Sequence, residues 1–357
     1  MNSPTSQAPV FYSEDGLEKL NLHLKDTNYS KVFILVDSNT INSCLNVFLQ
    51  NFKTEVEIEI IEMEAGEENK NIETCTQIWK TLSDLGGDRK SLLINLGGGV
   101  VTDLGGFIAS TFKRGIAYVN IPTTLLAMVD ASIGGKTGID LDNLKNQVGV
   151  ISQPEMVIIQ PEFLATLPAI EMRSGLAEIL KHGLIANKNY WEKATQLQNM
   201  TLDDLEELIA GSVEIKSNIV QQDPTEKNLR KTLNFGHTLG HAIESYFLTA
   251  PEKEHLLHGE AIAIGMIMAG YLSSEIQGLQ KVELEMITQN LLEFFPKTVI
   301  SNEDFEQIKE LLKFDKKNSH GNINFVLLEK IGVAKVDCIV PPELLDKARD
   351  YYNAAQI

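Results

Sequence analysis

The chain has 357 residues, of which 43% are hydrophobic and 22% are charged, and its formal net charge is −18. This length is typical of about two domains. The acidic balance argues against nucleic acid or an anionic membrane surface as the general partner. It leaves room for an anionic small substrate, because a binding site responds to its local charges.

The cysteines and the N-terminal residues indicate the compartment. The three cysteines, Cys44, Cys75 and Cys338, are widely spaced and form no Cys-x-x-Cys pair, which suits a reducing environment without disulfides. Residues 1–7 lack the basic-then-apolar order of a signal peptide. No apolar run reaches the length of a membrane span. We therefore expect a cytoplasmic protein.

The first half of the chain alternates short β-rich runs with helical patterns. A helix is predicted over 71–85, and strands are predicted over 31–36, 56–61, 91–96, 117–121 and 156–160. Buried strands that alternate with helices predict a parallel sheet with helices on both faces. The expected fold class is a Rossmann-like α/β nucleotide-binding domain over residues 1–168.

The second half changes character near Pro168 and becomes mostly helical. A strand is expected only at 322–328, and helices are predicted over 170–186, 191–198, 202–220, 229–247, 260–277 and 281–295. These patterns predict a mainly α-helical metal- and substrate-binding domain over residues 169–357. A cleft between the two domains is the expected ligand site.

A glycine turn follows one predicted strand and precedes a probable helix. Gly97, Gly98 and Gly99 allow backbone N–H groups to approach a phosphate, whose charge the helix N-terminus favours. Thr102 occupies the third glycine position of the usual dinucleotide pattern, and a simple tight turn is the competing interpretation. Asp37 follows an early strand and is able to accept hydrogen bonds from a ribose.

Two further groups of polar residues lie in loops of this half. Glu67 and Lys70 are placed to flank a ribose, although solvated loop charges would look the same. Asp130, Lys136 and the pair 145–146 lie in glycine-rich turns between apolar runs. Lysines in such turns suit an anion, and tight turns alone would also explain the glycines.

Histidines are concentrated in the helical half. His237 and His241 stand four residues apart, which places both imidazoles on one face of a helix, and His258 heads a later apolar run. Two histidines on one face with a third nearby can hold a divalent metal. Glu244 and Glu260 are equally ligand-like by composition, and ordinary polar residues on a helix face remain the alternative.

Six motifs along the chain together resemble the 3-dehydroquinate synthase family, and they come in the family's order over about 30–335. They are residues 97–103, 121–127, 132–138, 175–181, 233–244 and 258–266. The resemblance implies a cytoplasmic lyase of the shikimate pathway, which leads to chorismate and the aromatic amino acids. It would convert 3-deoxy-D-arabino-heptulosonate 7-phosphate to 3-dehydroquinate and phosphate. The implied steps are transient oxidation by NAD, phosphate elimination, re-reduction and an intramolecular aldol.

The resemblance also implies NAD, one divalent metal (zinc or cobalt) and a particular set of metal ligands. Those ligands are Glu178, His237 and His258, and His241 becomes a substrate or proton-transfer contact beside the metal. A carboxylate and two imidazoles leave coordination positions open for substrate. From spacing alone, Glu178 and Lys181 would equally make an exposed i, i+3 ion pair.

The resemblance also implies catalytic, substrate-binding and NAD-binding roles for individual residues of this sequence. The catalytic set that the resemblance implies is Asp130, Lys136, Lys181, Lys216, Arg230, Asn234 and His241. The substrate-binding set is Arg114, Lys136, Lys145, Asn146, Lys216, Arg230, Asn234, His241, Lys316 and Lys317. The NAD-binding set is Asp37, Asn39, Glu67, Lys70, Gly98, Gly99, Val100, Asp103, Thr123, Thr124, Leu126, Lys136, Lys145, Phe163, Thr166 and Leu167. A homodimer is implied, in which Arg114 reaches the neighbouring active site.

Three alternatives remain at this point. A sister sugar phosphate cyclase of the valiolone or deoxy-inosose type would share most motifs, but Lys216, Arg230, Asn234 and His241 together favour a substrate with a carboxylate. A metal-dependent polyol dehydrogenase would release NADH and would not need so many phosphate-directed cations. A binding protein without activity is disfavoured because no motif residue is missing.

Overall fold

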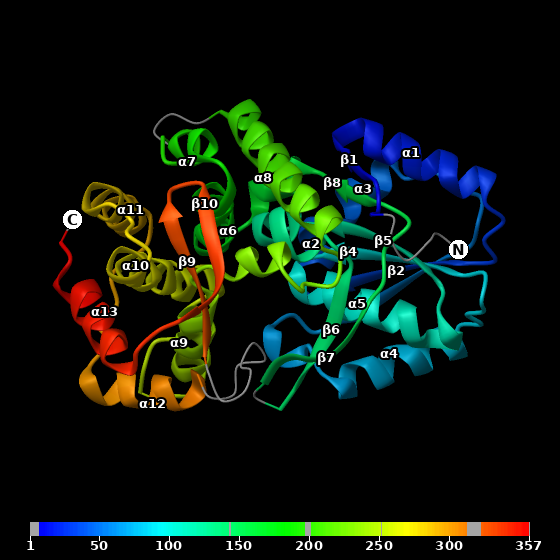
Figure 1. The fold of residues 1–357 in the computed structure, drawn as a ribbon. Helices are drawn as coiled ribbons and strands as arrows, with labels where there is room; N and C mark the ends of the chain where they lie inside the picture. The colour runs from blue at the N-terminus through cyan, green and yellow to red at the C-terminus, as the bar shows by residue number, and fades with distance from the viewer. Residues whose placement is uncertain (1–6, 143, 197–200, 251, 313–322, 357) are drawn as a thin grey trace. The chain divides into compact units, whose positions relative to one another are not determined.

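The computed structural model describes residues 7–142, 144–196, 201–250, 252–312 and 323–356. The chain divides into two compact units, Met1–Pro168 and Ala169–Ile357. Figure 1 shows a sheet flanked by helices in the first unit and mostly helices in the second. This is the α/β-then-helical fold class that the sequence predicts. No helix in the described ranges combines the length and apolarity that a membrane crossing requires.

A parallel sheet of six strands forms the centre of the first unit. Its order is β1 (Val10–Tyr12), β8 (Val157–Ile159), β5 (Ala117–Pro122), β4 (Leu92–Gly97), β2 (Val32–Asp37) and β3 (Ile58–Met63). Residues 32–36 of β2 are fully buried, because helices cover both faces of the sheet. The five predicted strands are all present, with ends displaced by one or two residues.

Helices pack on both sides of this sheet. On one face, α4 (Ile72–Asp84) and α5 (Gly99–Thr111) bury apolar side chains such as Ile78 and Leu104 against Phe33 and Leu35 of β2. The remaining helices of this unit are α1 (Ser13–Asp26), α2 (Thr40–Ser43) and α3 (Leu45–Asn51). Because the six strands run parallel, their carboxyl ends share one edge of the sheet. Ligands bind at this edge in folds of this kind.

Lys136 and residues 145–146, which the sequence analysis assigned to turns, lie in an antiparallel hairpin of β6 (Lys136–Leu141) and β7 (Leu144–Ile151). Gly138 and Gly149 pair directly in it. A Cβ at Gly138 would lie 2.6 Å from the carbonyl oxygen of Val148. The glycines that suggested loops are thus required by the close approach of the two strands.

The second unit is built around α10 (His258–Ile276), which is buried continuously from Gly259 to Gly270. The other elements are α6 (Ala169–Ala186), α7 (Lys188–Ala194), α8 (Leu202–Gln222), α9 (His237–Thr249), α11 (Lys281–Phe294), α12 (Asn302–Leu312), α13 (Pro342–Ala354), β9 (Asn324–Lys330) and β10 (Val333–Ile339). β9 pairs antiparallel with β10, a strand that the sequence analysis missed.

The single helix predicted over 229–247 is wrong. A short 3-10 turn, η5 (Leu229–Asn234), ends before Gly236, and α9 starts afresh at His237. Gly236 has φ +76, and a Cβ there would lie 2.9 Å from the backbone nitrogen of Met266. The close passage of α10 therefore requires glycine at the break, and Asn234 is not on the helix that carries His237.

Candidate active site

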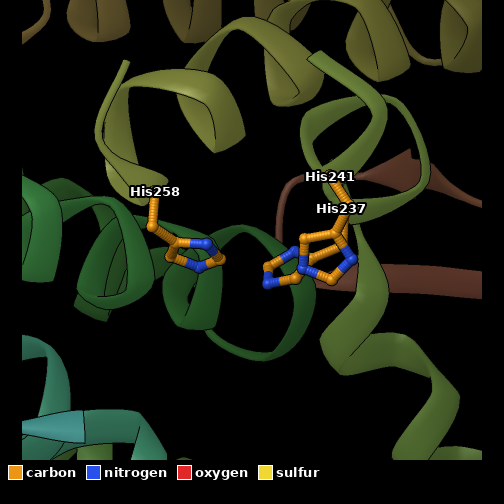
Figure 2. A group of neighbouring side chains, drawn as sticks. All are labelled: His237, His241 and His258. Carbon is orange, nitrogen blue, oxygen red and sulfur yellow. The ribbon is translucent and has the colours of Figure 1, made fainter. Parts of the chain in front are cut away.

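Three side chains from three helices meet in the second unit. Glu178 on α6 is fully buried, and its Oε1 lies 3.3 Å from Nε2 of His237 on α9 and 3.6 Å from Nε2 of His258, the first residue of α10. Figure 2 shows His237 and His258 directed toward each other from separate helices. Among the described residues, Glu178 Oε1 has no hydrogen-bond partner although it is buried.

The far nitrogens of both rings are occupied, which fixes how the rings are turned. Nδ1 of His237 lies 3.0 Å from the carbonyl oxygen of Phe235, which can only accept, so this nitrogen carries the proton. Nδ1 of His258 lies 3.2 Å from Oε2 of Glu244 and donates to that carboxylate. In the neutral rings each Nε2 then carries a lone pair that faces Glu178 Oε1. This is how metal-ligating histidines are usually held.

These atoms fit a divalent metal. Ligands about 2.1 Å from a tetrahedral ion lie about 3.4 Å apart, and the two separations from Glu178 Oε1 are 3.3 and 3.6 Å. Glu178 Oε1 is buried without a hydrogen-bond partner, which is unfavourable unless a cation between it and the two ring nitrogens completes the site. The donor set of one carboxylate and two imidazoles suits a catalytic zinc or cobalt.

Lys181 contacts the other oxygen of Glu178, Oε2, from the next turn of α6. Both side chains are buried, so the exposed ion pair that spacing alone allowed is excluded. Burial opposes ionisation of Glu178, but Lys181 and His237 outweigh it and hold the pKa of this carboxyl well below its usual value. The carboxylate is therefore charged at neutral pH, as a metal ligand must be.

The two histidines are shifted in opposite directions. Burial, helped by the positive charge of Lys181, lowers the pKa of His237 to about 4. Burial also disfavours the imidazolium of His258, but Glu244 and Glu178 outweigh it and raise its pKa to about 10. His237 is thus neutral at pH 7, whereas a metal must displace a proton from His258.

His241 lies one turn after His237 on α9, on the same face, as the spacing predicted. Its ring centroid is 5.1 Å from that of His237 and 5.8 Å from that of His258 (Figure 2). One ring nitrogen from each of the three histidines falls within 4.8 Å of the others. The geometry thus contains both ligand sets that the sequence left open, and the buried, undonated oxygen of Glu178 favours the set with the carboxylate.

The basic substrate-binding candidates of this unit are buried as well. Lys216 on α8 is 6% exposed, and Arg230 on η5 is 2% exposed and donates to the carbonyl of Pro224 at 3.0 Å. The loop before η5 is ordered by Asp223, whose carboxylate accepts from the backbone nitrogen of Arg230 at 3.0 Å. Lys316 and Lys317 lie outside the described residues.

Two further acidic residues hold side chains of the site, and the sequence analysis named only one of them, Glu244, as a possible metal ligand. Glu244 holds His258, and Glu226 accepts a hydrogen bond from Asn234 Nδ2 at 2.9 Å. Glu244 lies seven residues after His237 on α9, so helical periodicity was a usable signal for it. Glu226 lies in the loop between α8 and η5, and no periodic pattern indicates its role.

The NAD-binding candidates follow the carboxyl ends of the parallel strands in the first unit. Asp37 ends β2, Gly98 and Gly99 follow β4, Thr123 and Thr124 follow β5, and Phe163, Thr166 and Leu167 lie on the turn after β8. The glycine turn leads into the N-terminus of α5, and the amide of Thr123 donates to the carbonyl of Gly97 at 3.0 Å. This arrangement suits a dinucleotide phosphate.

Further candidates of the first unit lie on neighbouring turns. Asp37 Oδ1 accepts from the backbone nitrogens of Asn39 and Thr40 at 3.0 and 2.8 Å, so it orders the turn after β2. Lys136 begins β6, and Asp130 lies on a π-helical turn over Ala127–Ala131. Val100, Asp103 and Leu126 lie on or beside these glycine and threonine turns.

Comparison with known proteins gives a consistent result. Family models for the 3-dehydroquinate synthase N-terminal and C-terminal regions match residues 60–174 and 175–318. The chain is 40% identical to 3-dehydroquinate synthase of Parabacteroides distasonis over 350 residues, 98% of each chain.

Solved structures of related cyclases share the fold. The 2-epi-5-epi-valiolone synthase of Streptomyces hygroscopicus, with NAD+ and Zn2+ bound, is 26% identical, with a TM-score of 0.85 over 99% of this chain and 98% of that one. A 2-deoxy-scyllo-inosose synthase complexed with carbaglucose-6-phosphate, NAD+ and Co2+ is 24% identical, with a TM-score of 0.83 over 97% and 99%. On the family models and the curated relative, this chain belongs to the 3-dehydroquinate synthase family.

Proposed function

We propose that the protein converts 3-deoxy-D-arabino-heptulosonate 7-phosphate to 3-dehydroquinate and phosphate, as a carbon–oxygen lyase of the shikimate pathway. The observation that carries the proposal is the set of His237 and His258 around the buried carboxylate of Glu178, in a chain that is 40% identical to a curated member of the family over nearly its whole length. The substrate is a small anionic sugar phosphate.

The test is a coupled assay for phosphate and dehydroquinate with purified protein, NAD and zinc or cobalt. Both products should appear in equal amounts with no net accumulation of NADH. Accumulation of NADH with a plain polyol would instead indicate a dehydrogenase.

Glu178, His237 and His258 would hold the metal, and the turns after β2, β4, β5 and β8 would hold NAD. When bound, the divalent ion supplies Lewis-acid polarisation of substrate hydroxyls, and NAD supplies a reversible hydride acceptor. Because Nδ1 of each ligating ring is held by a fixed acceptor, neither histidine has to turn when substrate arrives. The protein thus supplies a preorganised site.

Cations of this chain would bind and orient the substrate's two acidic groups. The proposed set is Lys136 and Lys145 in the first unit and Lys181, Lys216 and Arg230 in the second, within a chain whose formal net charge is −18. The guanidinium of Arg230 is suited to bidentate contact with a carboxylate or phosphate, whereas lysines act as point charges. Burial of Lys216 and Arg230 strengthens their attraction for an anion.

His241 and Asn234 are the proposed groups for proton handling beside the metal. His241 shares a helix face with His237, and the amide of Asn234 is oriented by Glu226. Asp130 is proposed to lie near the reacting carbon. His241→Ala should lower turnover while metal binding persists, which separates a proton-handling role from ligation.

The sister cyclases have less support than the proposed activity. The valiolone and deoxy-inosose synthases are 26% and 24% identical to this chain, against 40% for the curated 3-dehydroquinate synthase. Turnover of a related sugar phosphate without a carboxylate in preference to the heptulosonate phosphate would favour one of them.

We also propose a cytoplasmic homodimer in which Arg114 reaches the neighbouring active site. Arg114 and Lys113 have positive φ angles of 69° and 52° and are exposed at the end of α5. Non-glycine residues in this conformation are uncommon and cluster at functional sites. A monomer that turns over normally in dilute solution would contradict the role of Arg114. The free thiols of Cys44, Cys75 and Cys338 suit a reducing compartment, which cell fractionation would test.

A further inference from the structure

Lys70 is a buried lysine whose ammonium group is hydrogen-bonded to other residues of the first unit. Its side chain is 4% exposed, and it follows the short turn η1 (Glu67–Asn69) after β3. Its Nζ donates to Asp103 Oδ2 on α5 and to Asn146 Oδ1 on β7, both at 2.7 Å. One ammonium therefore bridges the helix that follows the glycine turn and the β6–β7 hairpin.

Asn146 has a left-handed backbone conformation, and contacts that run from Lys70 through Asp140 stabilise it. Its φ is +52, and it lies in a bulge where only Asp140 of β6 stands opposite residues 145–147 of β7. The amide of Asn146 donates to Asp140 Oδ1 at 2.5 Å, and the amide of Asp140 donates to the carbonyl of Lys70 at 2.8 Å. Lys70, Asp140 and Asn146 thus form a closed ring of contacts around the bulge.

The neighbouring Lys145 is tied to the same turn. Its Nζ lies 3.3 Å from Oε1 of Glu67. Both members of the expected substrate-binding pair, Lys145 and Asn146, are therefore held by side chains of residues 67–70. Bulges frequently re-aim side chains next to active sites and persist only when the surroundings fix them.

We propose that Lys70 is a positioning residue for substrate binding: its ammonium fixes the β7 bulge that presents Lys145 and Asn146 to the anionic substrate. This role goes beyond a direct contact of Lys70 with NAD. The proposed role predicts that loss of the ammonium loosens the β6–β7 hairpin even when no ligand is present. Asp103, an expected NAD contact, shares the same ammonium, so the two ligand regions of this unit are joined through one side chain.

Amide hydrogen exchange of the ligand-free, full-length protein tests the core of the proposal without reference to activity. Lys70→Met removes both side-chain hydrogen bonds, so amides of residues 145–150 should exchange about tenfold faster, whereas those of β4 should not change. Asn146→Ala leaves Lys70 in place and should give the same local effect, which covers the case that Lys70→Met fails to fold.

Lys31→Met is the matched control. Lys31 is also a largely buried lysine of this unit. Its Nζ donates to the carbonyl of Leu85 at 2.9 Å and lies 3.2 and 3.6 Å from the carboxylates of Glu57 and Glu59, which are outside the hairpin. Its substitution should leave exchange of residues 145–150 unchanged. Wild-type exchange rates over residues 145–150 in both Lys70→Met and Asn146→Ala would overturn the proposal.

The kinetic consequence rests on the proposed function and is measured only once wild-type turnover is established. Lys70→Met should raise the KM for the heptulosonate phosphate about tenfold at saturating NAD, a larger effect than its effect on kcat. Adding Lys70→Met to Asn146→Ala should change the KM little further, because both act through one bulge. An increase in the KM for NAD alone would overturn the proposal. Absence of wild-type activity would instead count against the proposed function, and the exchange result would stand by itself.

Discussion

Oε2 of Glu244 lies 3.2 Å from Nδ1 of His258, so a carboxylate on α9 fixes the ring of a histidine on α10. The side chain of Glu244 is 6% exposed, which strengthens its attraction for the N–H of the ring. His237 is fixed in the same way by a backbone carbonyl two residues before it. The orientation of His258 in the proposed metal site therefore depends on the side chain of Glu244, whereas that of His237 depends on a backbone carbonyl.

Glu244→Gln should weaken zinc or cobalt binding by about 10- to 100-fold, because loss of the carboxylate makes the His258 ring a poorer and less well oriented ligand. Metal titration of the apoprotein with a competing chelator measures this directly. Glu275→Gln, on the exposed end of α10, is the matched control and should bind metal like wild type. Equal affinities for wild type and Glu244→Gln would contradict the orienting role.

The proposed ligand set makes a second prediction about the histidines. His258→Ala should abolish stoichiometric metal binding, because Nε2 of His258 lies 3.6 Å from the buried oxygen of Glu178, whereas His241→Ala should retain it, because His241 is proposed as a substrate contact. Metal content after dialysis, measured by atomic absorption, distinguishes the two variants. Equal loss in both would restore the three-histidine set as the ligands.

The strands of the sheet were predictable from the sequence because each strand depends on a short run of its own residues. Runs such as residues 32–36 and 92–96 are β-rich, apolar and bounded by turn residues, which a buried parallel strand requires. The β6–β7 hairpin was not predictable in the same way. Gly138 and Gly149 suggest loops until the partner strand is known, because their purpose is a cross-strand approach.

The site was predictable in its residue types and only partly in its geometry. The i, i+4 spacing correctly placed His237 and His241 on one helix face, but Glu178 comes from a helix 59 positions earlier, and no periodicity connects it to them. Its assignment came from the family resemblance. The partner of His237 is the carbonyl of Phe235, which every residue type would supply, so the sequence carries no signal for it.

The break before α9 predicts that replacing Gly236 by alanine strongly destabilises the folded protein. Gly236→Ala should lower the free energy of unfolding by about 3 kcal/mol, from the left-handed backbone and the overlap with the backbone of Met266 together. Denaturant unfolding measures it.

Gly278→Ala is the matched control for this measurement. Gly278 has a similar φ of +79, but a Cβ there meets nothing within 4 Å, so only the backbone term applies. That variant should lose about 1 kcal/mol. Equal losses at the two positions would mean that the contact with α10 contributes nothing.

Acid should weaken the second unit through Asp304, near the start of α12. Tyr246 donates to its Oδ1 at 2.6 Å, and Lys253 and the amide of Ser301 donate to its Oδ2 at 2.9 and 3.1 Å. Burial opposes ionisation, but these hydrogen bonds outweigh it and hold the pKa of Asp304 well below its usual value. One carboxylate thereby joins the end of α9 and the loop before His258 to α12.

The sign of the pH effect follows from that depressed pKa. The stabilisation is fully present above the pKa of an unfolded aspartate, about 4, and is lost as the pH falls through the lower pKa of the folded state. Asp304→Asn should therefore unfold about 1 to 2 kcal/mol more easily than wild type at pH 7, and this difference should shrink as the pH is lowered toward 3. Urea unfolding across this range measures it, with Glu303→Gln on the exposed face of α12 as the control. A difference between Asp304→Asn and wild type that stays constant with pH would show that the carboxylate is not preferentially ionised in the folded protein.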